Sequence, residues 1–148
     1  MRLSLNETML DICDVLAHRA ACVKRQVGCV LTSKDGQIVG TGYNGRARGW
    51  PNCSPADPCR GNICEGVHAE INALMQARGE VYKAYVSTFP CWHCIKSLLN
   101  TSCKIIVFRS GTMDKDQQRA YDLWLSVRTI LVIGGELDEW KSRGLQKA

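Results

Sequence analysis

Four side chains in two short segments could together hold a metal ion and move protons beside it. His68-Ala69-Glu70 offers an imidazole and a carboxylate, and Pro90 to Cys94 offers the thiols of Cys91 and Cys94. Zinc held by three protein ligands keeps a fourth position for water, whose pKa it lowers toward neutrality. A glutamate two residues from the histidine is well placed to shuttle the protons of that water. The spacing therefore predicts a catalytic zinc site with Glu70 as proton carrier.

Both segments are expected at the starts of helices, which must bring them together. Cys91 and Cys94 are three residues apart, so on a helix they face the same side and can reach one ion. The N-terminus of a helix also favours the thiolate form that binds metal. A redox pair is the alternative interpretation of C-x-x-C, but a redox pair does not need an upstream H-x-E.

The hydrophobic pattern predicts alternating strands and helices. A capping box at Ser4-Leu5-Asn6-Glu7 begins an amphipathic helix that runs to about Ala21. The expected strands are Val27–Thr32, Gln37–Tyr43, Val81–Ser87, Lys104–Phe108 and Thr129–Ile133, and the later helices are His68–Ala77, Cys91–Asn100, Asp114–Val127 and a short tail helix through Trp140. A hairpin followed by this alternation predicts an α/β fold with a mixed, largely parallel five-stranded sheet and helices on both faces.

Length and composition narrow the class of protein. The 148 residues, of which 45% are hydrophobic and 22% charged, suit a single globular domain over residues 1–148. The start of the chain becomes polar too soon for a secretory signal, and no window approaches the ~18 apolar residues of a membrane span. We therefore expect a cytoplasmic protein, located in the host cytoplasm if it is viral. The net charge of +5 suits a small anionic substrate better than a nucleic acid.

The residues that carry the predicted chemistry also match a known family. H-x-E followed by P-C-x-x-C is the signature of zinc nucleobase deaminases. Over about residues 5–110 the chain resembles the cytidine deaminase superfamily, and most closely the deoxycytidylate (dCMP) deaminase family. The matching segments are Val27-Gly28, Thr41-Gly42-Tyr43-Asn44-Gly45, Arg48-Gly49, His68-Ala69-Glu70-Ile71-Asn72-Ala73 and Thr88-Phe89-Pro90-Cys91-Trp92-His93-Cys94. G-Y-N-G with a nearby R-G narrows the resemblance to nucleotide deaminases.

The resemblance implies a three-layer α/β/α fold and an activity. The implied reaction is the zinc-dependent hydrolytic deamination of dCMP to dUMP and ammonia, which supplies dUMP for thymidylate synthesis. Glu70 would move protons to the ring nitrogen and the leaving ammonia. Asn44 matches the position that contacts the sugar, and the peptide groups around Ala69 and Phe89 would read the edge of the base.

A nucleotide also needs cations or backbone donors near its phosphate. The candidates are Lys24 and Arg25 before the first strand, Arg46 and Arg48 after the G-Y-N-G segment, and Arg78. In the family, an arginine near the end of the H-A-E helix selects for the phosphate, and Arg78 falls about one position early. In the alternative interpretation, each of these side chains is an ordinary charge on the protein surface that contacts solvent and not a nucleotide.

A second set of cysteines lies in and before the long irregular stretch that follows G-Y-N-G. A loop of this length in a compact domain is usually functional or held by a metal. Four thiols are enough for a closed structural zinc site. Some dCMP deaminases carry a second zinc, and Cys22 and Cys53 match two of its ligand positions. We therefore expect a structural zinc at Cys22, Cys53, Cys59 and Cys64. The alternative is reduced or disulfide-forming thiols, and Cys103 is the substitute ligand.

Family resemblance further implies a homo-oligomer, typically a hexamer, with dCTP and dTTP as allosteric effectors. We expect no membrane and no nucleic acid as partners. Two other classes stay open: a deaminase of the same fold that acts on free cytidine, guanine or a tRNA adenosine, and a non-catalytic zinc protein. A tRNA enzyme should carry a basic tail, and Lys141, Arg143 and Lys147 make only a thin one. A purely structural zinc site does not need Glu70.

Overall fold

A mixed β-sheet runs through the part of the chain that the computed structural model describes, residues 2–57, 59, 64–109, 111–134 and 139–143. Its strands lie in the order β2 (Ile38–Tyr43), β1 (Gly28–Thr32), β5 (Lys83–Val86), β6 (Ile105–Arg109), β7 (Thr129–Gly134) and β8 (Glu139–Arg143). A second, two-stranded sheet pairs β3 (Gly45–Arg46) with β4 (Gly66–Val67). The five expected strands are therefore confirmed, and β8 is additional.

Two expectations about this sheet are wrong. The sheet is not largely parallel, because only the β5–β6 and β6–β7 pairs are parallel. The β1–β2, β1–β5 and β7–β8 pairs are antiparallel. Glu139 and Trp140, expected at the end of the tail helix, lie in β8, where Trp140 pairs with Ile133, and residues 135–138 of that expected helix lie outside the described part of the chain. This pairing supplies hydrogen-bond partners to the backbone at the edge of β7, which would otherwise be open. The pattern of apolar residues in a short tail does not show that a neighbouring strand needs such partners.

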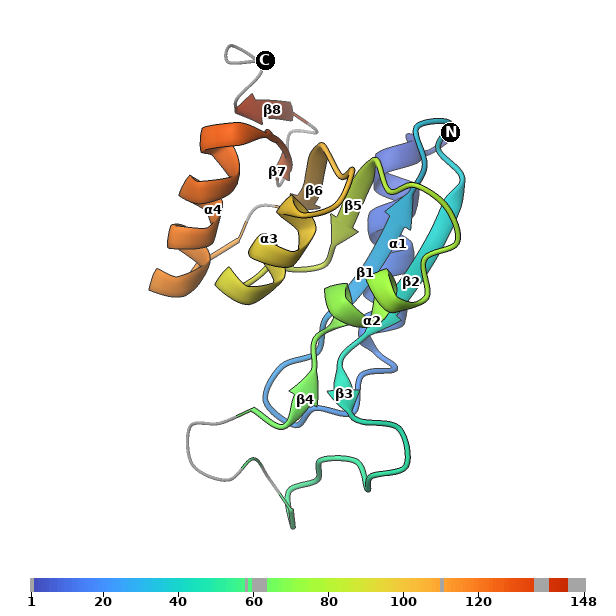
Figure 1. Ribbon diagram of the computed structural model, residues 1–148, viewed down its shortest axis with the longest axis vertical. Coiled ribbons are helices and arrows are strands. Elements are labelled where there is room, and N and C mark those ends of the chain that lie inside the picture. Colours follow the sequence, from blue (N-terminus) through green and yellow to red (C-terminus); the bar gives the residue numbers. More distant parts are fainter. Residues whose placement is uncertain (1, 58, 60–63, 110, 135–138, 144–148) are drawn as a thin grey trace.

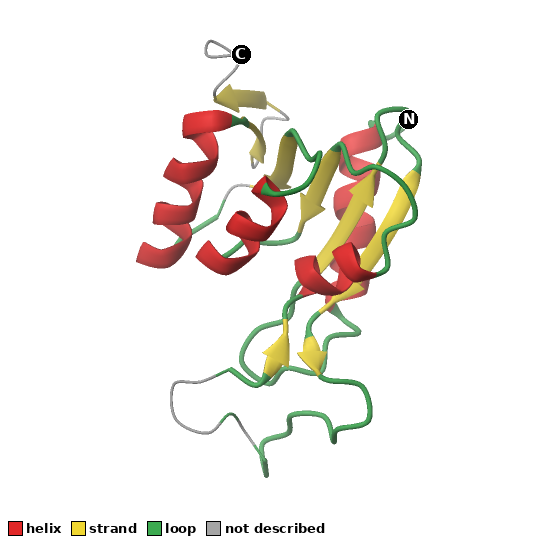
Figure 2. Cartoon of the chain, viewed as in Figure 1, coloured by secondary structure: helices red, strands yellow, loops and turns green. Residues whose placement is uncertain are grey.

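The helices form a layer on each face of the sheet (Figures 1 and 2). α1 (Leu5–Ala17) covers one face, and α2 (Ala69–Met75), α3 (Trp92–Leu99) and α4 (Lys115–Val127) cover the other. Successive residues of a strand point to opposite faces. One core cluster accordingly joins α1 to Val30, Tyr85 and Val107, and the other joins α2, α3 and α4 to Leu31, Ala84 and Ile106. This arrangement confirms the three-layer α/β/α fold.

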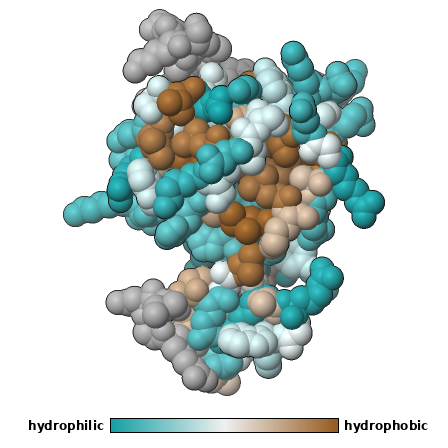
Figure 3. Space-filling view, viewed as in Figure 1, coloured by the Kyte–Doolittle hydropathy of each residue, from teal (hydrophilic) through white to brown (hydrophobic). Residues whose placement is uncertain are grey.

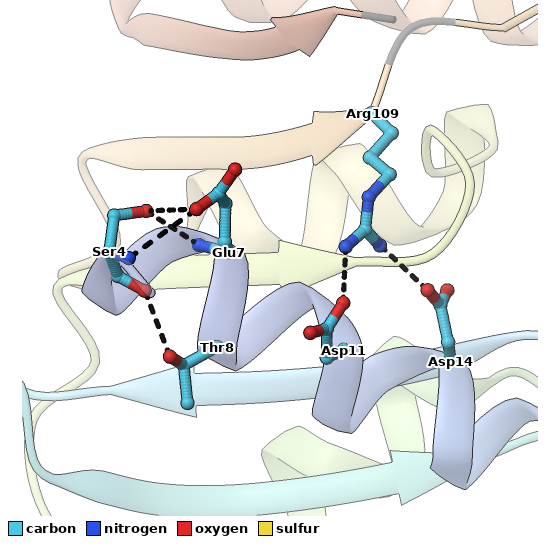
Figure 4. Close-up of polar contacts among 6 residues, drawn as sticks. All are labelled: Ser4, Glu7, Thr8, Asp11, Asp14 and Arg109. Atoms are coloured by element: carbon cyan, nitrogen blue, oxygen red, sulfur yellow. Dashed lines mark hydrogen bonds and ion pairs between the residues drawn. The ribbon is translucent and has the colours of Figure 1, made fainter. Parts of the chain in front are cut away.

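The first helix begins as the sequence predicts and is held at its side by an arginine (Figure 4). The Ser4 hydroxyl accepts from the Glu7 N–H at 3.2 Å, and the Glu7 carboxylate accepts from the Ser4 N–H, which completes the capping box. The Arg109 guanidinium of β6 bridges Asp11 at 2.5 Å and Asp14 at 2.7 Å. These contacts orient α1 across the sheet.

Two glycines of β2 let α2 approach the sheet closely. A Cβ atom at Gly40 or Gly42 would collide with the carbonyl oxygen of Ala73 or Ala69, respectively. A side chain at either position would therefore push α2 outward, and with it the residues at its N-terminus. In the described ranges, no helix is long and apolar enough to cross a membrane.

Candidate active site

The fold brings the two chemical segments together at the starts of two helices. His68 is the N-cap of α2, Cys91 is the N-cap of α3, and Cys94 lies in the first turn of α3. His68 Nδ1 lies 3.3 Å from the Sγ of Cys91 and 3.3 Å from the Sγ of Cys94. Among the described residues, this is the group of potential ligands whose atoms all lie within 4.8 Å of one another.

The spacing fits a zinc ion. With ordinary Zn–N and Zn–S bond lengths, a tetrahedral site separates a nitrogen from a sulfur ligand by about 3.6 Å. The observed separations of 3.3 Å differ from this value by a few tenths of an ångström. One imidazole and two thiols leave the fourth position open, as in a catalytic site rather than a closed structural one.

Hydrogen bonds within the cluster already favour a thiolate. The hydrogen bond from the Cys94 thiol stabilises the charged form of Cys91, and His68 adds to this effect. Burial opposes it, and the net result is that the pKa of Cys91 is lowered to about 3. The same hydrogen bond raises the pKa of Cys94. The bond to Cys91 also raises the pKa of His68. Because zinc binds the deprotonated thiol, the chemistry of this donor set suits the metal.

Glu70 lies beside the three potential ligands and is almost removed from solvent. Its exposed fraction is 3%, and burial raises the pKa of its carboxyl group. A raised pKa makes a carboxyl group a better proton acceptor, and such a group can take a proton and return it in a later step. This is the property that a proton shuttle requires.

The cluster opens onto a cavity of about 400 Å³, which is within the size range of small-molecule sites. Phe89 and Ala69 form part of the wall and are themselves 2% and 0% exposed. The side chains and backbone around the cavity are those of Cys22, Lys24, Arg25, Val27, Asn44, Gly45, Cys53, Cys59, Cys64, Gly66, His68, Ala69, Glu70, Thr88, Phe89 and Cys91.

Asn44 lines the cavity but has a second task. Its Oδ1 accepts from the Val27 N–H at 2.7 Å, and its Nδ2 donates to the Arg25 carbonyl at 2.8 Å. Asn44 therefore holds the segment that leads into β1. Its contact with a sugar stays a prediction.

The cations proposed for phosphate binding separate into two groups. Arg46 forms ion pairs with Asp57 at 2.7 Å and Glu65 at 3.3 Å, and its side chain is 4% exposed. Arg48 and Arg78 are exposed, and none of these three arginines lies in the cavity wall as described. Lys24 and Arg25 do lie in it.

The cysteines of the second set, Cys22, Cys53, Cys59 and Cys64, line the same cavity. Burial raises the pKa of Cys53, Arg46 lowers it, and the neighbouring Cys59 and Cys22 raise it further. Cys22 Sγ accepts from the backbone N–H groups of Lys24 at 3.4 Å and Arg25 at 3.3 Å, and Cys64 Sγ accepts from Gly66 at 3.4 Å. Within the described residues, no three of these thiols come within 4.8 Å of one another.

Two residues that touch this site were not anticipated from the sequence. Gln117 of α4 donates to the Phe89 carbonyl at 2.8 Å, and Asp116 accepts from the Trp92 N–H at 2.9 Å. The available signal was the D-x-x-Q capping box that begins α4 at Asp114. That motif predicts the start of the helix but not what the helix touches.

Comparison with known proteins places this geometry in a family. Residues 3–110 match the model of the cytidine and deoxycytidylate deaminase zinc-binding region. The deoxycytidylate deaminase of Mycobacterium phage D29 is 32% identical over 119 residues, which cover 70% of this chain and 92% of that protein. The deoxycytidylate deaminase of Saccharomyces cerevisiae is 32% identical over 129 residues, which cover 78% of this chain. The chain spans 41% of that protein and 38% of the Schizosaccharomyces pombe relative.

Solved structures show the same fold. The dCMP deaminase of cyanophage S-TIM5, crystallised with dCMP and dUMP, superposes with a TM-score of 0.72 at 20% identity. The match covers 91% of this chain and 99% of that one. The region that matches the family model, residues 3–110, contains the potential metal ligands His68, Cys91 and Cys94, and it contains Glu70, which lines the cavity. On this basis the chain belongs to the cytidine and deoxycytidylate deaminase family.

Proposed function

We propose that this protein hydrolyses dCMP to dUMP and ammonia. The observation that carries the proposal is the buried carboxyl group of Glu70 beside three zinc-type ligands at the wall of a nucleotide-sized cavity. The deoxycytidylate deaminases among the relatives support dCMP as the substrate. The dUMP formed would supply thymidylate synthesis.

His68, Cys91 and Cys94 would hold the zinc ion, which when bound lowers the pKa of water and polarises it for attack. Glu70 takes a proton from the attacking water and delivers it to the ring nitrogen of cytosine. It then carries the second proton to the departing amino group, so that water and dCMP become dUMP and ammonia. Because the Glu70 side chain is itself buried, bulk water is kept from competing for these protons.

Release of ammonia from a panel of substrates tests the proposal. The purified protein, with its zinc content measured, is incubated with dCMP, deoxycytidine, dCTP, guanine and an adenosine-bearing RNA. We expect dCMP to be deaminated with the highest kcat/KM. Preference for another member of the panel would replace dCMP with that substrate, and no ammonia from any of them would reject the enzymatic function.

The structure favours Lys24 and Arg25 as the phosphate ligands, because they line the cavity and Arg46, Arg48 and Arg78 do not. A hydrogen bond to a charged group contributes about 1.5–3 kcal/mol. We therefore expect Lys24→Met or Arg25→Met to raise the KM for dCMP by about 10- to 100-fold and to leave the KM for deoxycytidine nearly unchanged. Arg48→Met is the matched control, since Arg48 is exposed and lies outside the cavity wall. An equal loss on both substrates would refute phosphate contact.

We infer that a second zinc ion is held by Cys22, Cys53, Cys59 and Cys64. These thiols line one cavity, and backbone N–H groups donate to the sulfur atoms of Cys22 and Cys64. We expect two zinc ions per chain in the unchanged protein and one in Cys59→Ser. The variant should melt at a lower temperature and keep the zinc at His68. One zinc per chain in the unchanged protein would contradict this assignment.

We also infer that the chain forms a homo-oligomer. Met75 of α2 and Val127 of α4 are 67% and 62% exposed. Figure 3 shows hydrophobic residues at the surface of the face that carries these helices. Burial of such side chains between copies would remove apolar surface from water. A hexamer and its control by dCTP and dTTP stay predictions from the family.

A further inference from the structure

Gln117 is the polar residue of α4 that is hidden from solvent most completely, with an exposed fraction of 2%. In the described part of the chain, the buried polar or charged residues are Thr32, Glu70 and Gln117. A buried amide is costly unless it is hydrogen-bonded, so its partners indicate what it is for. One of these three residues, Glu70, is already the proposed proton carrier.

Both ends of the Gln117 amide are engaged. Its Oε1 accepts from the Asp114 N–H at 3.0 Å, which completes the capping box of α4. Its Nε2 donates to the Phe89 carbonyl at 2.8 Å and to the Thr88 hydroxyl at 3.3 Å. A capping box accepts glutamate as readily as glutamine at this position. The bond to the Phe89 carbonyl needs a donor, which the glutamine amide provides and an ionised glutamate does not.

The bond to Phe89 controls a rigid part of the cavity wall. The peptide between Phe89 and Pro90 has no N–H, so its carbonyl is its one strong hydrogen-bonding group. Proline also fixes the backbone angle that leads directly into Cys91. Because Phe89 lines the cavity and Cys91 is a proposed zinc ligand, the orientation of this peptide affects both.

α4 holds the other side of Cys91 as well. Cys91 is the N-cap of α3 but makes no side-chain cap bond, because its sulfur faces His68. The carboxylate of Asp116 accepts from the N–H of Trp92, the first residue of α3, at 2.9 Å. The Arg119 guanidinium lies 3.7 Å from the centre of the Trp92 ring. α4 therefore contacts the chain immediately before and immediately after Cys91.

We propose that Gln117 and Asp116 are positioning residues for the deamination reaction, which set the orientation of the Phe89 peptide and of Cys91. They act through other groups and do not touch the substrate. The inference rests on the proposed function where it is tested by kcat for dCMP, but the test by cobalt absorption needs no substrate. A displacement of about 1 Å in a catalytic group can cost 10²-fold in rate.

Three variants on one helix test this proposal. Gln117→Met keeps the size of the side chain and removes its donor and acceptor, and Gln117→Glu keeps the capping acceptor. Gln118→Met is the matched control, because the Gln118 side chain is exposed and donates to the exposed Asp122 of its own helix. We expect kcat for dCMP to fall by roughly 10- to 100-fold in Gln117→Met, with unchanged zinc content and less change in KM. The control should stay within twofold of the unchanged protein.

Gln117→Glu adds a second measurement, the pH dependence of kcat, which a change in packing alone would not alter. Its carboxyl group can donate to the Phe89 carbonyl only when it is protonated. The ratio of its kcat to that of the unchanged protein should therefore rise as the pH is lowered from about 8 to 6. Asp114 and Asp116, the acidic groups of the same turn, are present in both proteins and cancel in the ratio.

Cobalt substitution tests the geometry without any substrate. The visible absorption of cobalt bound at His68, Cys91 and Cys94 should change in Gln117→Met and stay the same in Gln118→Met. A folded Gln117→Met protein with kcat within twofold and an unchanged cobalt spectrum would overturn the proposal. If that variant does not fold, a flat kcat ratio in Gln117→Glu would overturn it instead. An unchanged protein that deaminates nothing counts against the proposed function alone.

Discussion

Glu70→Gln is expected to lower kcat for dCMP by about 10²- to 10⁴-fold, the usual contribution of a positioned general acid–base group. The amide has nearly the same shape but cannot take a proton from water. Because Glu70 is buried, with an exposed fraction of 3%, no bulk water replaces it as the proton carrier. Steady-state ammonia release at saturating dCMP measures the effect.

Zinc content and thermal melting serve as the controls for this variant. Both should be unchanged, or melting should occur at a slightly higher temperature, because the variant no longer buries an ionisable carboxyl group. Asp122→Asn, an exposed carboxyl-to-amide change on α4, should leave kcat unaltered. A Glu70→Gln protein that keeps a tenth or more of the original kcat would remove Glu70 from the mechanism.

Cys94→Ala is expected to release the catalytic zinc and to lower turnover by roughly 10³-fold or more. Polarisation by a metal contributes several kcal/mol, and each 1.36 kcal/mol is tenfold in rate. His68 and Cys91 alone leave the ion with two protein ligands, fewer than a catalytic zinc site uses. Metal analysis after dialysis, together with ammonia release, measures the loss.

Cys103→Ala is the matched control, because Cys103 is also a buried thiol but does not belong to the group of His68, Cys91 and Cys94. Burial raises its pKa to about 12, so it stays a protonated, unreactive thiol. This variant should lose some stability through packing and keep its zinc and its kcat. Equal zinc loss in both variants would mean that Cys94 acts through packing rather than as a ligand.

Much of the fold could be predicted from local patterns. The capping box at Ser4 and Glu7 predicts the start of α1, and runs of apolar residues predict β6 and β7. Each pattern depends on neighbours within about one helical turn or one strand, which a sequence displays directly. The partners of the antiparallel β1–β5 pair, such as Cys29 and Val86, lie far apart in the chain, so this pair was not predicted. The edge strand β8 pairs with the neighbouring strand β7, and it was missed because the tail was expected to be helical.

The same division holds at the site. The sequence by itself predicted the potential zinc ligands and the proposed proton carrier, because His68 and Glu70 lie two residues apart and Cys91 and Cys94 three residues apart, each pair at the start of one helix. The tertiary structure decided which cations face the cavity, Lys24 and Arg25 rather than Arg46. It also decided that Gln117 holds Phe89, 28 residues away in sequence. Contacts of that range depend on how layers pack, and no local spacing encodes them.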